Sequence, residues 1–110
     1  MCGICGFVGV GDATVVWDML AAMPYRGPDG IGQWHDGNNL HLGHVRLSIV
    51  DIETGHQPLV TPDESLAVVF NGEIYNHRSL RKQLENLGYV FKTDHSDTEV
   101  LLYGYKQWGR

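Results

Sequence analysis

Alternating apolar and polar residues on either side of a short turn-forming run most constrain how this 110-residue chain can fold. The alternation covers residues 31–35 and 40–47, and Asp36-Gly37-Asn38-Asn39 lies between them. A period of two is typical of strands with one covered face, and Asp-Gly followed by Asn is typical of a hairpin turn. The sequence therefore predicts an antiparallel hairpin, and with it an antiparallel sheet.

Further short strands are predicted at residues 2–10, 66–70 and 89–91. The first is punctuated by glycines, and it and the second are expected to be buried. Residues 25–30 and 51–65 are rich in turn formers and are expected to be irregular.

Amphipathic helices are predicted for roughly residues 13–23, from an Asn76 cap to Gly88, and onward from the capping-box pattern Ser96-x-x-Glu99. The apolar residues at helical spacing are Val16, Met19, Leu20 and Met23, then Leu80, Leu84 and Leu87, then Val100, Leu101, Tyr105 and Trp108. Strands and helices together indicate the α+β class. The last helix ends close to residue 110 while other faces still need covering, so the chain is expected to be the first part of a larger domain.

The composition argues against several classes of function. The net charge is -5, and the only basic cluster, Arg78, Arg81 and Lys82, is followed by Glu85 and indicates a solvated helix face. Nucleic-acid binding is therefore not expected. The longest apolar run, residues 66–70, is too short to cross a membrane, and the start lacks the pattern of a signal peptide. A cytoplasmic location is the default expectation.

The cysteines Cys2 and Cys5 form a C-x-x-C pattern in a segment predicted to be extended. Residues three apart in a strand point to opposite faces, so neither a redox pair nor half of a zinc site is expected. His41 and His44 have the same spacing in a predicted strand. The sequence predicts no metal site.

Cys2 follows Met1 directly, which is a chemically important position. Removal of Met1 would leave Cys2 with a free α-amine, whose reference pKa is about 7.7–8.0, beside a thiol whose reference pKa is about 8.5. That amine could act as the base that activates the thiol as a nucleophile. A buried structural cysteine is the alternative.

A thiolate that attacks an amide needs donors for the developing negative oxygen, and Asn71-Gly72 offers a side-chain amide beside an unhindered backbone N–H. Arg46 is suited to a carboxylate, and Asp97 and Glu73 are suited to an ammonium group. Taken one at a time, these residues could equally be a plain Asn-Gly turn, surface charges or a helix cap.

Several segments occur together in one order, and in combination the chain resembles class II glutamine amidotransferases. The closest resemblance, over essentially all 110 residues, is to the glutaminase domain of glutamine-hydrolysing asparagine synthetases. The segments are Met1-Cys2-Gly3-Ile4, Tyr25-Arg26-Gly27-Pro28-Asp29, Arg46-Leu47-Ser48-Ile49-Val50-Asp51, Gln57-Pro58-Leu59, Asn71-Gly72-Glu73-Ile74-Tyr75-Asn76 and Ser96-Asp97-Thr98-Glu99.

The resemblance implies a fold and a set of roles. The fold is the N-terminal-nucleophile (Ntn) hydrolase four-layer α/β/β/α sandwich with antiparallel sheets, incomplete in this chain. Cys2 would be the nucleophile, and Asn71 and Gly72 would form the oxyanion hole. The substrate glutamine would be bound by Arg46, Leu47, Ile49, Val50, Asn71, Gly72, Glu73 and Asp97.

The implied activity is hydrolysis of the glutamine side-chain amide to supply ammonia to an ATP-dependent asparagine synthetase, which is a ligase. The partners implied are L-glutamine, a synthetase domain in cis or in trans, and a second copy in a homodimer. Residues 1–110 contain no ATP-binding domain, so no cofactor is expected in this chain, and ATP and Mg are expected only in the missing synthetase domain. A non-catalytic, truncated glutaminase-like module and an amidotransferase with a different acceptor remain the alternatives.

Overall fold

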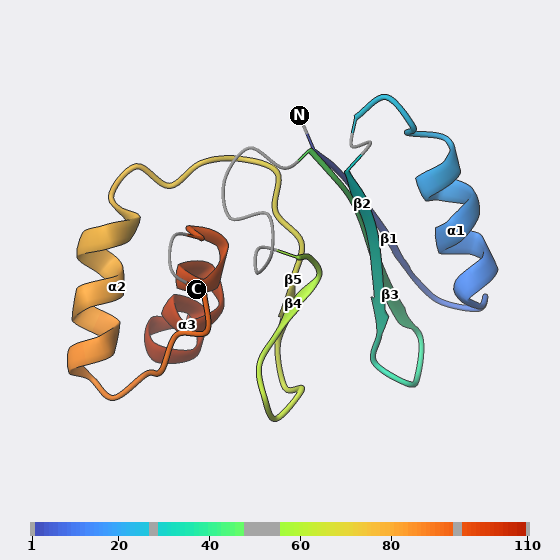
Figure 1. The fold of residues 1–110 in the computed structure, drawn as a ribbon. Coiled ribbons are helices and arrows are strands. Elements are labelled where there is room, and N and C mark those ends of the chain that lie inside the picture. Colours follow the sequence, from blue (N-terminus) through green and yellow to red (C-terminus); the bar gives the residue numbers. More distant parts are fainter. Residues whose placement is uncertain (1, 27–28, 48–55, 94–95, 110) are drawn as a thin grey trace.

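The computed structural model describes residues 2–26, 29–47, 56–93 and 96–109. Helix α1 (Ala13–Ala21) covers one face of a three-stranded sheet, and a two-stranded ribbon lies on the side of the sheet away from α1 (Figure 1). Helix α3 (Thr98–Trp108) packs on the ribbon, and helix α2 (His77–Asn86) packs on α3. This mixture of helices and antiparallel strands confirms the predicted α+β class.

The three-stranded sheet contains the hairpin that the sequence predicts. Its strands are β1 (Gly3–Val8), β2 (Gly30–His35) and β3 (Leu40–Arg46), in the order β1-β3-β2 and antiparallel throughout. Asp36 shapes the turn, because its Oδ1 accepts hydrogen bonds from Asn38 N at 2.8 Å and Leu40 N at 3.1 Å. These bonds favour the ionised carboxylate and lower the pKa of Asp36.

The outer core lies between α1 and the sheet. Asp12 caps α1 by accepting from Thr14 N at 2.9 Å, and Val16 and Leu20 of the helix pack against Val45 of β3. The helix lies very close to the strand at Gly43, where an added Cβ would stand 2.7 Å from Cγ1 of Val16. A larger residue at this position would push α1 off the sheet.

Strand β1 corrects the prediction of a buried strand at residues 2–10. It is an edge strand, and Ile4 and Val8 on its inner face are 46% and 71% exposed. The chain on either side of the ribbon instead meets β2 and β3, with Gln57 at Gly32 and Phe70 at His44. The strand itself was predicted from the sequence, but which strand lies at the edge of the sheet depends on pairing.

The ribbon is shorter than the prediction and begins where no strand was predicted. Strand β4 (Leu59–Val60) falls in the region expected to be irregular, and β5 (Ala67–Val68) is a half-buried piece of the strand expected at 66–70. Asp63 organises the intervening turn, accepting from Thr61 Oγ1 at 2.7 Å and from Lys106 Nζ of α3 at 3.3 Å. Hydrogen bonds from Thr61 and Ser65, with a smaller contribution from Lys106, hold the pKa of Asp63 well below its usual range.

A second core joins α2, α3 and the segment between them. Leu84, Val100 and Tyr103 are buried, and Leu80, Tyr89 and Phe91 pack around them. Within the described part of the chain, residues 89–91 form no strand, which corrects that prediction. The buried face of α3 also differs from the prediction, because Tyr105 and Trp108 are half-exposed whereas Leu102 and Tyr103 are buried.

The predicted helix caps are wrong in detail, although the helices themselves and Gly88 after α2, with φ of 101°, are confirmed. The Asn76 side chain makes no capping bond to α2 in the described structure. Glu99 does not complete a capping box, because its carboxylate accepts from Lys92 N at 2.8 Å and Thr93 N at 2.9 Å. The carboxylate of Glu99 is instead the acceptor for these two backbone amides, of which that of Thr93 is buried.

Arg81 also departs from the expected solvated face. Its guanidinium donates to the carbonyl of Thr93, forms an ion pair with Glu85 at 2.8 Å and lies 4.7 Å from the centre of the Phe91 ring. Arg81 therefore ties α2 to the segment that leads into α3.

None of the helices that the structure describes is long and apolar enough to cross a lipid bilayer.

The contact between β2 and the chain before β4 leads to a test. A Cβ on Gly32 would stand 1.9 Å from the carbonyl oxygen of Gln57, whereas a Cβ on Gly30 would meet nothing closer than 3.8 Å. We expect Gly32→Ala to lower the free energy of unfolding by at least about 1–3 kcal/mol, because the main chain of β2 or of Gln57 must move. Gly30→Ala, in the same strand and on the same face, should leave it nearly unchanged. Urea denaturation measures both, and equal effects would contradict the packing described.

Candidate active site

The thiol of Cys2 is held at the junction of β1 and β3. Cys2 directly precedes β1, and its Sγ accepts from Leu47 N at 3.4 Å and donates to Leu47 O at 3.8 Å. Its carbonyl accepts from Arg26 Nε at 3.4 Å. Because Gly3 pairs with Val45, these contacts extend the β1–β3 pairing past the end of the strands. The antiparallel register therefore places the half-buried sulfur beside the chain that leaves β3.

Arg46 is the last residue of β3 and lies at the same end of the sheet as Cys2. It is 6% exposed, pairs with Gly30 of β2, and its Nη1 lies 3.5 Å from Nδ1 of His56. A buried guanidinium is costly unless it has anionic or polar partners, and the ring of His56 is one such partner.

His44 connects this sheet to the chain after the ribbon. It pairs with Ile4 of β1, is 1% exposed, and its ring hydrogen-bonds to the main-chain carbonyl of Phe70. Burial lowers the pKa of His44, the Phe70 hydrogen bond raises it, and the charge of Arg46 lowers it further, with burial the largest cause. The imidazole is therefore held neutral.

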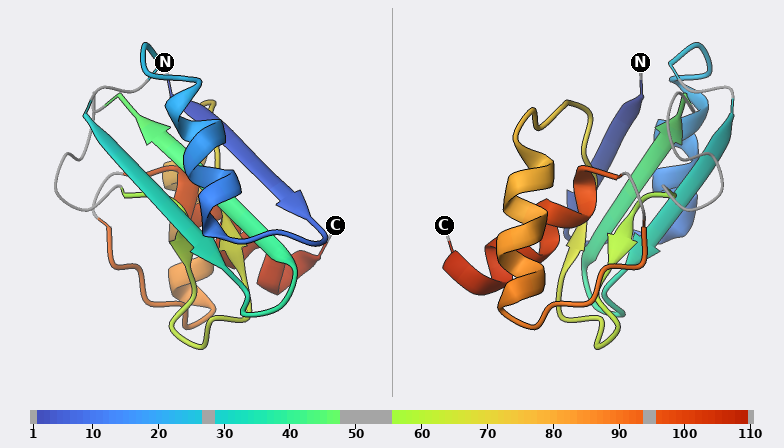
Figure 2. Two further views of the ribbon diagram at one scale, coloured as in Figure 1. Left: turned by 90° about the vertical axis from the view of Figure 1, so that its right-hand side faces the viewer. Right: turned by 60° about the vertical axis from the view of Figure 1, so that its left-hand side comes forward.

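The Phe70 contact brings the Asn71-Gly72-Glu73 segment to the site. His44 pairs with Ile4, which is two residues after Cys2, and Asn71 directly follows Phe70. The chain between β5 and α2 passes the end of the molecule at which β1 begins, in both views of Figure 2 and in Figure 1. Asn71, Gly72 and Glu73 are exposed there.

Asp97 binds the end of this segment that leads toward α2. Its Oδ2 accepts a hydrogen bond from Ile74 N at 2.8 Å, and its side chain makes no capping bond to α3 in the described structure. Asp97 is therefore not simply a helix cap, which was the alternative for this residue. A carboxylate has a second oxygen that can accept from a cation.

Gly72 has a steric reason to lack a side chain. An added Cβ would stand 2.8 Å from Cζ of Phe70, so the turn folds back over that ring. An ordinary side chain at this position would displace the ring or the turn.

Gln57 is the residue of this region to which sequence reasoning assigned no role. Its Oε1 accepts from Phe70 N at 2.6 Å, and its Nε2 donates to Oγ1 of Thr98 at 3.3 Å. The residue stands in the Gln57-Pro58-Leu59 motif, which was the only signal for it. His44 had no such signal, because a polar residue on the inner face of a strand looks like ordinary alternation.

Two predicted pocket residues, Ile49 and Val50, lie outside the described residues, as does Met1. Among the described site residues, Cys2, Leu47 and Arg46 are brought together, and so are Asp97 and the segment Asn71–Ile74.

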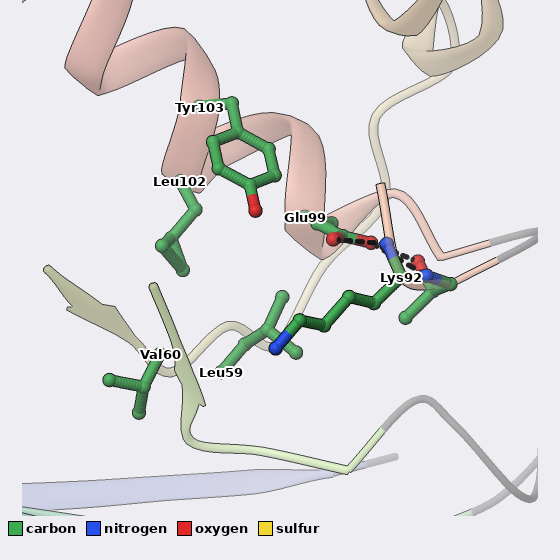
Figure 3. A pocket seen from close by; sticks show the side chains of 7 residues that line it. Leu59, Val60, Lys92, Glu99, Leu102 and Tyr103 are labelled. Atoms are coloured by element: carbon green, nitrogen blue, oxygen red, sulfur yellow. Dashed lines mark hydrogen bonds between the residues drawn. The ribbon is translucent and has the colours of Figure 1, made fainter. Parts of the chain in front are cut away.

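A small cavity lies elsewhere, between α3 and β4, with a volume of about 170 Å³ (Figure 3). Glu99 lines it, but both carboxylate oxygens already accept from Lys92 and Thr93. The cavity contains none of the predicted site residues. Its lining consists of Leu59, Val60, Lys92, Thr93, Glu99, Leu102 and Tyr103.

In the described part of the chain, no group of three or more His, Cys, Asp or Glu side chains could hold a metal ion. Cys2 and Cys5 are both free, and Cys5 packs on the α1 side, where burial raises the pKa of its thiol.

Sequence comparisons show the family to which the chain belongs. Residues 1–110 match the family described as the glutamine amidotransferase domain, and the chain belongs to that family. It is 44% identical to asparagine synthetase [glutamine-hydrolyzing] 1 of Bacillus subtilis (strain 168), over 96% of this chain and 18% of that protein. It is 40% identical to asparagine synthetase [glutamine-hydrolyzing] 1 of Arabidopsis thaliana, over 99% of this chain and 19% of that protein. The predicted resemblance is confirmed, and the chain spans under a fifth of the length of these curated relatives.

The neutral state of His44 predicts a pH dependence of stability. Its folded-state pKa is lowered, so below the unfolded value of about 6.5 the unfolded chain binds more protons than the folded one. We expect the free energy of unfolding to fall as the pH drops below about 6.5, with a contribution of at most about 1.4 kcal/mol per pH unit from one group.

His44→Gln, which keeps an amide donor for the Phe70 carbonyl, should remove this contribution. Urea denaturation between about pH 5 and pH 8 measures it. An unchanged pH slope in His44→Gln would show that another group is responsible.

Proposed function

We propose that this chain is the glutaminase part of an amidotransferase that hydrolyses the side-chain amide of glutamine and supplies ammonia for asparagine synthesis. The single observation that carries the proposal is the position of the Cys2 thiol. It is held by Leu47 at the end of the sheet where buried Arg46 and the chain following Phe70 also lie. Membership of the glutamine amidotransferase domain family supports the same reaction.

The reaction begins at Cys2 after removal of Met1. The free α-amine takes the thiol proton, directly or through a water, and the thiolate forms an Sγ–C bond with the carboxamide carbon. The C=O electron pair moves to oxygen, where the side-chain amide of Asn71 and the backbone N–H of Gly72 stabilise it. Collapse breaks the C–N bond and releases ammonia with the proton returned by the amine. Water then hydrolyses the thioester to glutamate and regenerates the thiol.

The substrate's own charges are bound by the charged residues around Cys2. Arg46 holds the α-carboxylate through bidentate hydrogen bonds, and Asp97 with Glu73 holds the α-ammonium. Asp97 can do so through the oxygen that does not accept from Ile74 N. Backbone groups of Leu47, Ile49 and Val50 line the pocket.

The same proposal covers the rest of the protein. Residues 1–110 form the N-terminal part of a glutaminase domain whose further strands complete the four-layer Ntn-hydrolase sandwich. A synthetase domain in cis or in trans binds ATP and Mg and passes the ammonia to an activated aspartate. The relatives' names, which specify glutamine-hydrolysing asparagine synthetase, and the small share of their length covered here support this division.

Replacing the nucleophile tests the proposal directly. In the full-length protein, Cys2→Ala should abolish glutamate release from glutamine and leave ammonia-dependent asparagine formation intact. The matched control is Cys5→Ala, since Cys5 packs against the outer core and burial raises the pKa of its thiol. Cys5→Ala should retain glutamine hydrolysis.

Mass spectrometry of the purified protein should find Cys2 at the N-terminus. Undiminished glutamate release in Cys2→Ala would overturn the mechanism. Glutamine hydrolysis without asparagine formation from aspartate would point to a different acceptor.

The oxyanion role has its own test. Asn71→Ala should lower kcat for glutamine hydrolysis about 10²- to 10³-fold, the usual cost of losing one oxyanion donor, with a smaller change in KM. Asn86→Ala, at the exposed end of α2, is the control and should leave both constants unchanged. Steady-state glutamate assays measure both, and an unaltered kcat in Asn71→Ala would remove Asn71 from the oxyanion hole.

A further inference from the structure

The peptide that leads into Asn71 is held from both sides by side chains of distant segments. The N–H of Phe70 donates to Gln57 Oε1 at 2.6 Å, and its carbonyl accepts from the ring of His44. His44 belongs to the centre of the three-stranded sheet, whereas Gln57 lies ahead of β4. Phe70 therefore cannot move relative to the sheet without breaking a hydrogen bond.

Gln57 is itself fixed at its main chain and at the far end of its side chain. Its carbonyl oxygen lies where a Cβ on Gly32 would come within 1.9 Å, so its main chain is packed directly on β2. Its Nε2 donates to Thr98 Oγ1 at 3.3 Å, and Thr98 is buried at the start of α3, next to Asp97. One side chain thus links the peptide before Asn71 to the residue after Asp97.

We infer that Gln57 is a positioning residue for the reaction proposed above, on which this inference rests: it sets the position of the Asn71 and Gly72 donors relative to the Cys2 sulfur. Asn71 and Gly72 are exposed and rely on their neighbours for position. Gln57 holds the peptide before them, and Asp97 holds the peptide after them through Ile74 N.

The physical reason for such a clamp is that donors to a developing negative charge act through preorganisation. A misplacement of about 1 Å can cost as much as 10² in rate, and an exposed Asn-Gly turn has little rigidity of its own. Substrate binding by Arg46 does not depend on this clamp in the same way, because the main chain of Arg46 is fixed in β3. The effect of Gln57 is therefore expected in kcat more than in KM.

Gln57→Leu and Gln57→Glu in the full-length protein separate the hydrogen bonds from the volume of the side chain. Leucine removes both bonds. Glutamate keeps an acceptor for Phe70 N, and the Thr98 hydroxyl can turn its proton toward it. The matched control is Gln107→Leu, which removes an exposed hydrogen bond to the Tyr89 hydroxyl at the other end of α3. Thr98→Val removes only the hydrogen bond from Gln57 Nε2 to Thr98 Oγ1. It is the test variant if Gln57→Leu does not fold.

The expected result is a separation of rate from binding. Gln57→Leu should lower kcat for glutamate release roughly 10- to 100-fold with little change in KM, while ammonia-dependent synthesis stays at the wild-type level. Gln57→Glu should retain most of kcat, Thr98→Val should show a smaller loss than Gln57→Leu, and Gln107→Leu should show none. Hydrogen exchange at the Phe70 amide should accelerate in Gln57→Leu and stay slow in Gln57→Glu.

The outcomes distinguish this inference from the proposed function. A wild-type protein that releases no glutamate, or releases it without needing Cys2, overturns the proposed function and this inference with it. A wild-type protein with Cys2-dependent activity but an unchanged kcat in Gln57→Leu, or equal losses in Gln57→Leu and Gln57→Glu, overturns only the role of Gln57. If ammonia-dependent synthesis fell in Gln57→Leu by the same factor as glutamate release, Gln57 would support the fold as a whole. That result would also overturn its role in positioning the donors.

Discussion

The pairing of β3 with a strand on each side is the constraint on which the site depends. One face of β3 contributes Val45 to the core under α1, and the other presents His44 and Arg46 to the chain around the ribbon. The same register carries the chain past β3 so that Leu47 meets the sulfur of Cys2. Loss of this register by one residue would exchange the two faces and separate all of these groups.

Buried polar groups serve different ends in the two halves of the molecule. Glu99 is buried, yet both of its carboxylate oxygens accept from the backbone of Lys92 and Thr93, so it stabilises the segment that leads into α3. Arg46 and His44 are also buried, but Arg46 directly precedes Leu47, which contacts the half-buried thiol, and His44 contacts Phe70, which precedes the exposed asparagine–glycine turn. Burial of charge indicates a functional site only where such groups converge on a place that substrate can reach.

The predictions that held were those that local chemistry decides. The hairpin around residues 36–39, the helix near residues 13–23 and the end of the second helix at Gly88 follow from turn formers and periodicity. The predictions that failed depended on distant partners. Glu99 had the spacing of a capping box, but its carboxylate accepts hydrogen bonds from the amides of residues 92 and 93 instead.

The order of motifs in the sequence was enough to determine the family, the candidate nucleophile Cys2 and the chemical types needed around it, because each follows from residue identity and spacing. What only the tertiary structure decided is which of these residues meet. The Cys2–Leu47 contact, the clamp of Gln57 and His44 on Phe70, and the bond from Ile74 to Asp97 each join segments far apart in the chain. Such contacts depend on strand register and layer packing, which no local pattern specifies.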